Sequence, residues 1–272
     1  MWTQIVGKTR MTLAPPLNHW WHVALHVSPR GLTTGPIVHR LGIVEIEFDF
    51  LRHELRVDAG GNGLRTRPLR AESVASFYDA FTDLLGALDC AATISTKPQE
   101  VPDPVPFEAD HANSSYDPAA AHDFWRILVS TRAVFERFRS HFIGKCSPAH
   151  FFWGSFDLAC TRFSGRPAPP RKGVISGPAY SHEVSSHGFW PGGMGIDSPA
   201  FYAYSVPPPP GLDQAAVRPA AAHWHTGLGE FILMYDDLRA APDPAGALYE
   251  FIESTYVAGA TLGNWDRAAL EI

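Results

Sequence analysis

Residues 73–88 carry apolar side chains at the spacing of a helix that buries one face. The apolar positions recur at i, i+3, i+4 and i+7, which places them on one side of a helix with 3.6 residues per turn. Ser73 stands just before them, where a hydroxyl can accept a hydrogen bond from the first turn. The apolar members of this predicted amphipathic helix are Val74, Phe77, Tyr78, Phe81, Leu84, Leu85 and Leu88.

Two further helices are predicted where an Asp-Pro pair opens a run of apolar residues at helical spacing. Aspartate is a favoured N-cap, and proline is accommodated in the first helical turn. One helix is expected to run from Asp117 to Gly144, and the other from Asp243 to Leu262. Their apolar positions are Phe124, Leu128, Phe135, Phe138 and Phe142 in the first, and Leu248, Phe251, Ile252 and Leu262 in the second.

The stretch VEIEFDF, residues 44–50, alternates apolar and acidic side chains as a strand does. The apolar set is Ile46, Phe48 and Phe50, and the acidic set is Glu45, Glu47 and Asp49. We expect the acidic set to form a solvated face, and secondarily a wall for a cationic ligand. Further strands are predicted at 53–57, 150–163 and 230–235, with a turn at 58–64.

Two distant stretches can be aligned without a gap, residues 17–27 and residues 148–158. The alignment places His19 on His150 and His26 on Asp157, and each stretch leads through strand-like sequence to an amphipathic helix. An internal repeat of this kind predicts an α+β fold of two pseudo-repeated units, packed as one compact domain. Each unit would be an antiparallel sheet with an amphipathic helix.

The first unit is expected to cover residues 1–110 and the second residues 111–272. The second unit is the longer one because it carries two Pro/Gly-rich insertions. These lie at residues 165–177 and 207–219, and their composition is typical of surface loops.

The amino-acid composition argues against several classes of function. The chain has 272 residues, 45% of them hydrophobic and 18% charged, with a formal net charge of −6. Its basic residues are scattered, so we expect no nucleic-acid partner. Neither a membrane-spanning run nor a secretory leader is recognised. The 3 cysteines are widely spaced, which is typical of reduced thiols and predicts a cytoplasmic protein.

Three long motifs resemble a bacterial family that is carried only as a domain of unknown function, family 5996. They include N-H-W-W at residues 18–21, H-F-F-W-G-S-F-D at residues 150–157 and S-H-E at residues 181–183. The resemblance spans the whole chain, and no established activity comes with it. His187, His223 and His225 fall outside the family pattern.

The histidines of these motifs predict a metal site. Imidazole nitrogens with one carboxylate are the usual donors for Zn or non-haem Fe. His19 and His150, at equivalent positions of the two units, would face each other, and His182 would complete the set. Glu183 or Asp157 would act as the acid/base or as the group that orients a ligand. The same residues could instead line a metal-free pocket, or the histidines could be structural.

The segment GFWPGG holds two large rings at a turn and predicts one wall of an aromatic pocket. The predicted walls are Trp20, Trp153, Trp190 and Phe189. The function predicted from these residues is a metal-dependent enzyme acting on a small organic molecule between the two units. It would be a hydrolase or a non-haem iron oxidoreductase. The alternative is a metal-free small-molecule binding or sensor protein. The oligomeric state is left open.

Other chemistries have weaker patterns. His223 and His225, followed by Glu230, resemble half of a cupin metal motif, although solvated residues at a strand edge are the preferred interpretation. Ser155 with Asp157 offers no recognised nucleophile motif. Cys146 could be a nucleophile if a neighbouring group lowered its pKa, and a plain cysteine at a helix end is preferred. No nucleotide cofactor motif is found in the sequence.

Overall fold

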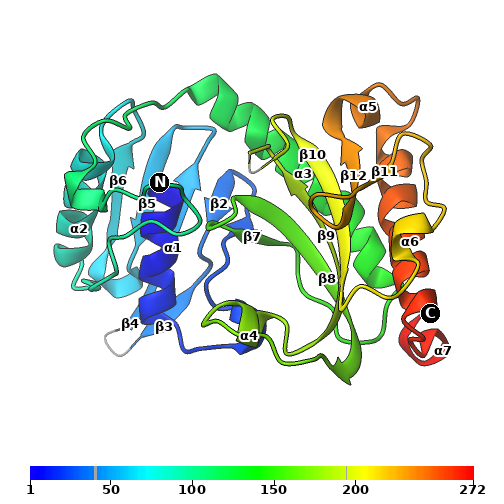
Figure 1. The fold of residues 1–272 in the computed structure, drawn as a ribbon. Helices are drawn as coiled ribbons and strands as arrows, with labels where there is room; N and C mark the ends of the chain where they lie inside the picture. The colour runs from blue at the N-terminus through cyan, green and yellow to red at the C-terminus, as the bar shows by residue number, and fades with distance from the viewer. Residues whose placement is uncertain (40–41, 194) are drawn as a thin grey trace. The chain divides into compact units, whose positions relative to one another are not determined.

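The computed structural model of the protein describes residues 1–39, 42–193 and 195–272 (Figure 1). It has the predicted α+β architecture, with helices and two antiparallel sheets. Its contacts divide the chain into two units. The first unit is Met1–Ile127 with Phe151–Ser155, and the second is Leu128–His150 with Phe156–Ile272.

The first sheet forms because its strands follow one another in the chain and pair as an antiparallel meander. Its strand order is β1-β2-β4-β5-β6, and β3 also pairs with β4. The strands are β1 (His26–Val27), β2 (Gly31–Thr33), β3 (Ile37–His39), β4 (Gly42–Asp49), β5 (Glu54–Asp58) and β6 (Leu64–Pro68). The predicted strand at 44–50 is therefore confirmed. Ile46 pairs with Val57 and is fully buried, as its apolar alternation requires.

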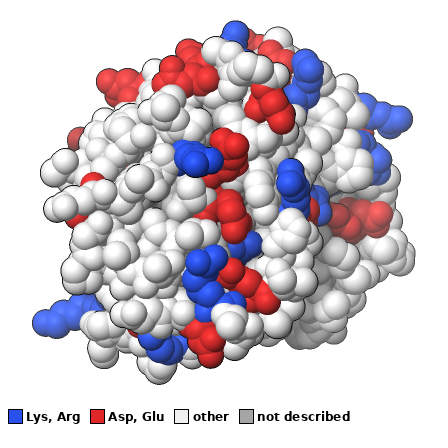
Figure 2. Space-filling model, turned by 90° about the vertical axis from the view of Figure 1, so that its right-hand side faces the viewer, with Lys and Arg blue, Asp and Glu red and all other residues white. Residues whose placement is uncertain are grey.

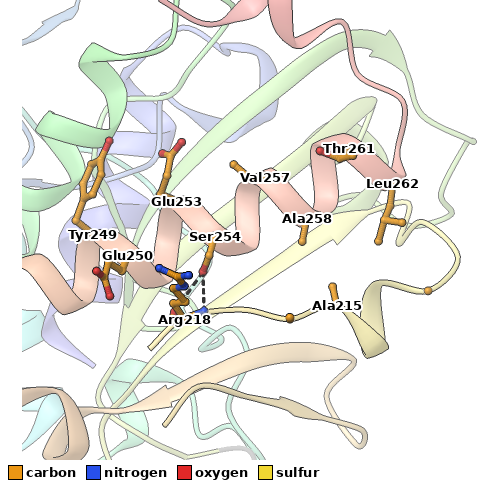
Figure 3. Close-up of a pocket in the computed structure, with 12 residues that line it drawn as sticks. Ala215, Arg218, Tyr249, Glu250, Glu253, Ser254, Val257, Ala258, Thr261 and Leu262 are labelled. Carbon is orange, nitrogen blue, oxygen red and sulfur yellow. Dashed lines mark hydrogen bonds between the residues drawn. The ribbon is translucent and has the colours of Figure 1, made fainter. Parts of the chain in front are cut away.

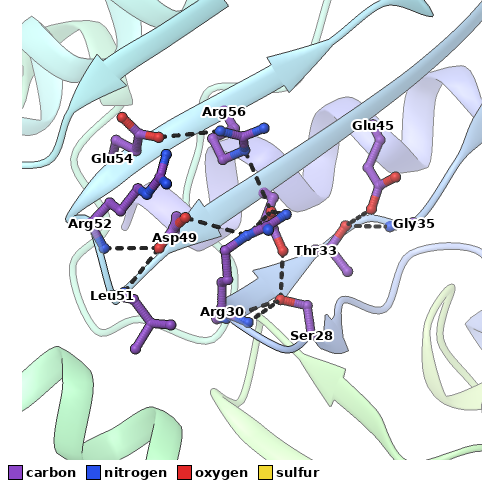
Figure 4. A network of polar contacts seen from close by, with 12 residues as sticks. Ser28, Arg30, Thr33, Gly35, Glu45, Asp49, Leu51, Arg52, Glu54 and Arg56 are labelled. Atoms are coloured by element: carbon purple, nitrogen blue, oxygen red, sulfur yellow. Dashed lines mark hydrogen bonds and ion pairs between the residues drawn. The ribbon is translucent and has the colours of Figure 1, made fainter. Parts of the chain in front are cut away.

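Two of the three acidic positions of β4, Glu47 and Asp49, are buried, so the prediction of a solvated face is wrong for them. Glu47 is 7% exposed and Asp49 is fully buried. Arg30 lies 3.0 Å from a Glu47 oxygen and 3.3 Å from an Asp49 oxygen, and Ser28 donates a 2.6 Å hydrogen bond to Glu47 (Figure 4). Arg56 also approaches Glu47. Buried carboxylates need such partners. Arg30, in the turn between β1 and β2, and Arg56 of β5 supply them.

Helices α1 and α2 lie entirely within the first unit, and the sequence pattern predicts one of them. Helix α2 (Val74–Gly86) begins where expected, and the Ser73 side chain accepts from the Ser76 amide. Helix α1 (Trp2–Leu13) was not predicted, because its buried face includes polar side chains. Gln4 accepts from the Gln99 amide and donates to its carbonyl, and Lys8 donates to the Lys97 carbonyl at 2.6 Å.

The second sheet has six strands in the order β11-β12-β10-β9-β8-β7. These are β7 (His150–Phe152), β8 (Asp157–Pro167), β9 (His182–Trp190), β10 (Ala200–Val206), β11 (His223–His225) and β12 (Glu230–Met234). The edge position of β11 and the exposure of His223 confirm the interpretation of a strand edge.

Helices α3 (Pro118–Ser140) and α6 (Pro244–Leu262) begin at the two predicted Asp-Pro pairs. Asp117 accepts from two amides of the first turn of α3, and Asp243 caps α6. Helix α3 ends at Ser140, four residues before the predicted end at Gly144. The short helices of this unit are α4 (Ser176–Ala179), α5 (Tyr235–Arg239) and α7 (Arg267–Leu270).

The two faces of the second sheet differ in what they carry. One face packs on α6, where Gly259 leaves room for Ser205 of β10. We call this the helix-packed face. Side chains alternate along a strand, so Tyr202 and Tyr204 of β10 lie on the opposite face. We call this opposite face the tyrosine face.

Arg162 of β8 occupies the centre of the helix-packed face although it is charged. Its side chain is 1% exposed. The guanidinium lies 3.4 Å from the ring centroid of Phe138 and 4.2 Å from that of Tyr256, and it donates to the Phe138 carbonyl. Glu253 of α6 approaches it at 3.8 Å. Stacked rings, a carbonyl and a carboxylate together replace the water that the cation loses.

Along the chain, a helix, an antiparallel sheet and a second helix follow one another twice, first from α1 to α2 and then from α3 to α6. This order supports the pseudo-repeat predicted from the sequence. The two aligned histidines nevertheless have different backbones. His19 lies in the 3-10 helix η1 (Asn18–Trp20) with φ of 54°, whereas His150 begins β7.

Charged side chains are mixed in sign on the face drawn in Figure 2, where acidic and basic groups alternate along a central band. None of the helices in the described ranges is both long enough and apolar enough to span a bilayer.

Candidate functional site

The tyrosine face places a carboxylate and two phenols next to one another. The hydroxyl of Tyr202 donates to a carboxylate oxygen of Asp157, the first residue of β8. The Tyr202 ring stacks on the Tyr204 ring with centroids 5.8 Å apart, and the Tyr204 hydroxyl lies 3.0 Å from that of Tyr180. Asp157 and Tyr202 are 7% and 9% exposed. Polar groups this buried are held in one arrangement by their mutual hydrogen bonds.

Gly188 makes room for the Tyr202 ring. It is the cross-strand neighbour of Tyr202 in β9, and a Cβ added there would lie closer than 3.0 Å to ring atoms of the tyrosine. A glycine opposite an aromatic residue lets the ring lie flat over the neighbouring strand. Because the ring lies there, its hydroxyl reaches across to Asp157.

Glu230 brings a second carboxyl to the tyrosine face. It is the first residue of β12, two positions before Ile232, which is the cross-strand neighbour of Tyr202. Burial raises the pKa of Glu230 to about 7, and the negative charge of Asp157 adds to the effect. A carboxyl with this pKa takes up and releases a proton near neutral pH, which is the property of a general acid or base.

The carboxyls border an apolar cluster on the same face. Trp190 and Tyr202 pack with Ile196, Ala200 and Ile232, and the cluster is completed by two partly buried neighbours, Tyr204 and Met234. Aromatic and apolar side chains beside a few fixed polar groups are typical of small-molecule sites. The arrangement therefore places a titratable carboxyl and a second carboxylate beside aromatic side chains.

Two residues predicted from the sequence, Asp157 and Trp190, meet at this face, because both adjoin Tyr202. Phe189 lies on the helix-packed face, where its ring contacts those of Phe201 and Tyr235. Neighbouring residues of a strand point to opposite faces, and this separates Phe189 from Trp190.

His182 and Glu183 lie at the other end of β9. Strand β9 has 9 residues, and its two ends, His182 and Trp190, are about 26 Å apart along the extended chain. Ser181 lies 3.0 Å from a ring nitrogen of His182, and Glu183 forms a 2.7 Å ion pair with Arg166. The structure therefore does not bring these two residues to Asp157.

The remaining predicted residues are divided between the units. His19, Trp20 and Trp153 belong to the first unit and His150 to the second. Both histidines are buried, at 5% and 3% exposure. The Trp153 indole donates a 2.8 Å hydrogen bond to the Val23 carbonyl, and Trp20 stacks on the ring of His22.

The metal site predicted at these histidines stays a prediction. Within residues 1–39, 42–193 and 195–272, no group of three or more His, Cys, Asp or Glu side chains could hold a metal ion. His19 and His150 lie in different units, so their meeting in one cavity is untested.

Sequence reasoning missed Tyr202 and the strand that carries it. The alternation in AFYAYSV, residues 200–206, is the signal that could have predicted β10. Glu230 was considered only as a partner of a histidine pair. The register does pair it with His225, whose Nδ1 accepts from the Leu228 amide.

A groove of about 620 Å³ lies elsewhere, between α6 and the segment 211–218 (Figure 3). Its apolar lining includes Val257, Ala258 and Leu262. A 2.9 Å hydrogen bond from the Arg218 amide to the Ser254 hydroxyl joins the segment 211–218 to α6. None of the predicted site residues lines it. We place the candidate site at the tyrosine face because that face, unlike the groove, combines a carboxyl that titrates near neutrality with a fixed second carboxylate.

Replacing Glu230 by glutamine should change the pH dependence of stability. The pKa of Glu230 is raised from 4.5 to about 7 in the folded protein. Protonated Glu230 therefore contributes to the free energy of unfolding at a pH below its pKa in the unfolded chain. This contribution is lost as the pH rises through about 7. Because the side chain is half exposed, we expect Glu230→Gln to be more stable than wild type by about 1–2 kcal/mol at about pH 8, and by little at about pH 4.5. Urea unfolding at both pH values measures this.

Glu250→Gln, at an exposed position of α6, is the matched control. It should stay within about 0.5 kcal/mol of wild type at both pH values. If Glu230→Gln differs from wild type by the same free energy of unfolding at both pH values, Glu230 is not the titrating group.

Comparison with known proteins gives a family and no activity. No curated protein matches the chain, and no solved structure does. The model of a family of unknown function, DUF5996, matches residues 1–272, which is the whole chain, and confirms the resemblance of its histidine and tryptophan motifs. This protein therefore belongs to the family DUF5996.

Proposed function

We propose that this protein binds a small organic molecule at the tyrosine face of its second sheet, and that Asp157 and Glu230 exchange protons with it. The observation that carries the proposal is the convergence of two carboxyls on Tyr202. One of them, Asp157, accepts from its hydroxyl, and the other, Glu230, has a pKa of about 7. Two neighbouring carboxyls in different environments are a common acid and base pair.

The chemistry of the face favours an amine as ligand. Asp157 supplies a fixed negative charge, and Glu230 adds a second one as the pH rises through about 7. Faces of aromatic rings attract organic cations, and the cluster presents Trp190 and Tyr204 beside these charges. A small aromatic ammonium ion would gain binding free energy from both the carboxylates and the aromatic rings. An uncharged analogue would gain it only from the rings.

Thermal unfolding with benzylamine and with benzyl alcohol tests this proposal. We expect benzylamine to raise the Tm in a saturable way, and benzyl alcohol to raise it less. The difference should be larger above pH 7 than below, because Glu230 then carries its charge. Asp157→Asn should reduce the difference because only the charge of Glu230 remains, and Glu250→Gln should leave it intact. Equal shifts for the two compounds in wild type, or an unchanged difference in Asp157→Asn, would refute the proposal.

The metal-dependent enzyme predicted from the sequence is a second proposal with its own test. Its support is the burial of His19 and His150, since buried imidazoles are common Zn and Fe ligands. Elemental analysis of protein purified without a His-tag should find a stoichiometric first-row metal. That metal should be lost in a His150→Ala variant that still folds. Metal-free wild-type protein would exclude this second proposal and leave the first unaffected.

The location of the protein is proposed on the same basis. Cys90, Cys146 and Cys160 are free thiols in the structure. Free thiols are typical of the reducing cytoplasm, so we propose that the protein acts there.

A further inference from the structure

Two cysteines of the second unit lie side by side on the helix-packed face. Cys146 lies between α3 and β7 and forms an antiparallel bridge with Arg162 of β8. Cys160 is two residues before Arg162, so it points to the same face. The two sulfur atoms are 4.0 Å apart. Cys146 is half-buried, whereas Cys160 is fully buried.

The surroundings of the two thiols are unequal. A hydrogen bond from the Cys160 thiol lowers the pKa of Cys146, and the positive charges of Arg139 and Arg162 lower it further. Burial raises the pKa of Cys160 well above its usual value. Burial of Cys146 acts in the opposite direction, and the net effect is a lowered pKa. A thiolate stabilised by cations is the reactive form of cysteine, and a fully buried thiol is not.

Backbone hydrogen bonds hold the two residues close together. The amide of Ser147 donates to the Thr161 carbonyl at 2.8 Å, and the amide of Phe163 donates to the Lys145 carbonyl at 3.0 Å. These bonds fix residues 145–147 against β8, with Cys146 diagonally opposite Cys160. A disulfide needs sulfurs about 2 Å apart, so the thiols must approach by side-chain rotation.

We propose that Cys146 is a peroxide-reactive thiol and that Cys160 is its resolving partner. The Cys146 thiolate attacks one oxygen of hydrogen peroxide, the O–O bond breaks, and hydroxide leaves, giving a sulfenic acid at Cys146. The Cys160 sulfur then attacks the Cys146 sulfur. The S–O bond breaks, the Cys160 proton and the hydroxyl depart as water, and a disulfide forms. The protein loses two electrons, which reduce the peroxide.

Cys90 serves as the internal comparison. It is buried in the first unit, its thiol donates to the Leu88 carbonyl at 3.2 Å, and burial raises its pKa. The Nε2 atom of His39 lies 3.8 Å from its sulfur. The same peroxide treatment should therefore leave Cys90 reduced.

The experiment treats the reduced full-length protein with a slight excess of hydrogen peroxide, followed by thiol titration, intact mass and peptide mapping. We expect wild type to lose two of its 3 thiols and to become lighter by two hydrogens, with a link between residues 146 and 160. Cys160→Ser should gain one oxygen at Cys146, and dimedone should trap it. Cys90→Ser should react as wild type does, and Cys146→Ser should form no disulfide.

Three outcomes would overturn the proposal. The Cys146→Ser variant could lose thiols as fast as wild type does. The wild-type protein could gain oxygen without forming a disulfide between residues 146 and 160, or it could keep all its thiols. Circular dichroism of each variant shows whether it folds. If Cys160→Ser does not fold, the peptide map of wild type and the thiol titration of Cys146→Ser still test the proposal, because both proteins keep the buried Cys160.

Discussion

Replacing Arg162 by alanine is expected to lower the free energy of unfolding by about 4 kcal/mol. The substitution empties a site whose side chain is 1% exposed and leaves the rings of Phe138 and Tyr256 facing a cavity. It also removes the donor to the Phe138 carbonyl and the cation beside Glu253. Removal of large buried side chains and removal of one partner of a buried ion pair each have costs of this order.

Urea unfolding of three variants separates packing from charge at this position. Arg162→Lys keeps the charge and loses the flat stack on Phe138, and we expect a loss of about 2 kcal/mol. Arg162→Met keeps much of the volume, so it should lose less than alanine does. Arg239→Ala, whose side chain is 67% exposed, is the control and should cost under about 0.5 kcal/mol. A loss under about 1 kcal/mol for Arg162→Ala would contradict the importance of the stack.

Replacing Gly188 by alanine is expected to cost about 2–3 kcal/mol and to abolish amine binding at the tyrosine face. The added Cβ would lie closer than 3.0 Å to the Tyr202 ring, so the ring must move. Its hydroxyl then leaves Asp157, a buried acceptor, and the apolar cluster around Trp190 loses a member. Urea unfolding gives the free energy, and the benzylamine Tm shift reports the binding.

A double-mutant cycle shows whether the cost arises at the ring. In a Tyr202→Leu background, Gly188→Ala should cost less than in wild type, because the ring is gone. Gly86→Ala is the matched control. Gly86 is exposed in α2 with no neighbour near an added Cβ, and alanine should stabilise it by up to about 1 kcal/mol. Equal costs of Gly188→Ala in both backgrounds would place the strain elsewhere.

Local patterns predicted the elements whose signals lie within a few residues. The caps Ser73, Asp117 and Asp243 marked three helix starts correctly, because a cap acts on its own first turn. The alternation of β4 was also read correctly. Its acidic face was misread because the partners of Glu47 and Asp49 include arginines that come from other strands or turns, and a local pattern contains no such information.

The candidate site was predicted in part, since Asp157 and Trp190 were chosen and Tyr202 was not. Tyr202 joins the other two through the register of β10 on β9 and of β9 on β8, over a separation of 45 residues. The predicted site relied mainly on histidines because imidazole is a common metal ligand. His187 shows the risk, since it is fully buried against Phe138, and burial lowers its pKa to about 3.

The polar anchors of α1 also bear on how the chain is made. Gln4 and Lys8 find their acceptors 95 and 89 positions later, in residues 97–99. During synthesis this stretch leaves the ribosome long after α1 has emerged. Until then the Lys8 amine and the Gln4 amide lack these acceptors, although α1 can already pack against β3 and α2. The hydrogen bonds of the first unit are therefore completed by a stretch that is synthesised after the meander and after α2.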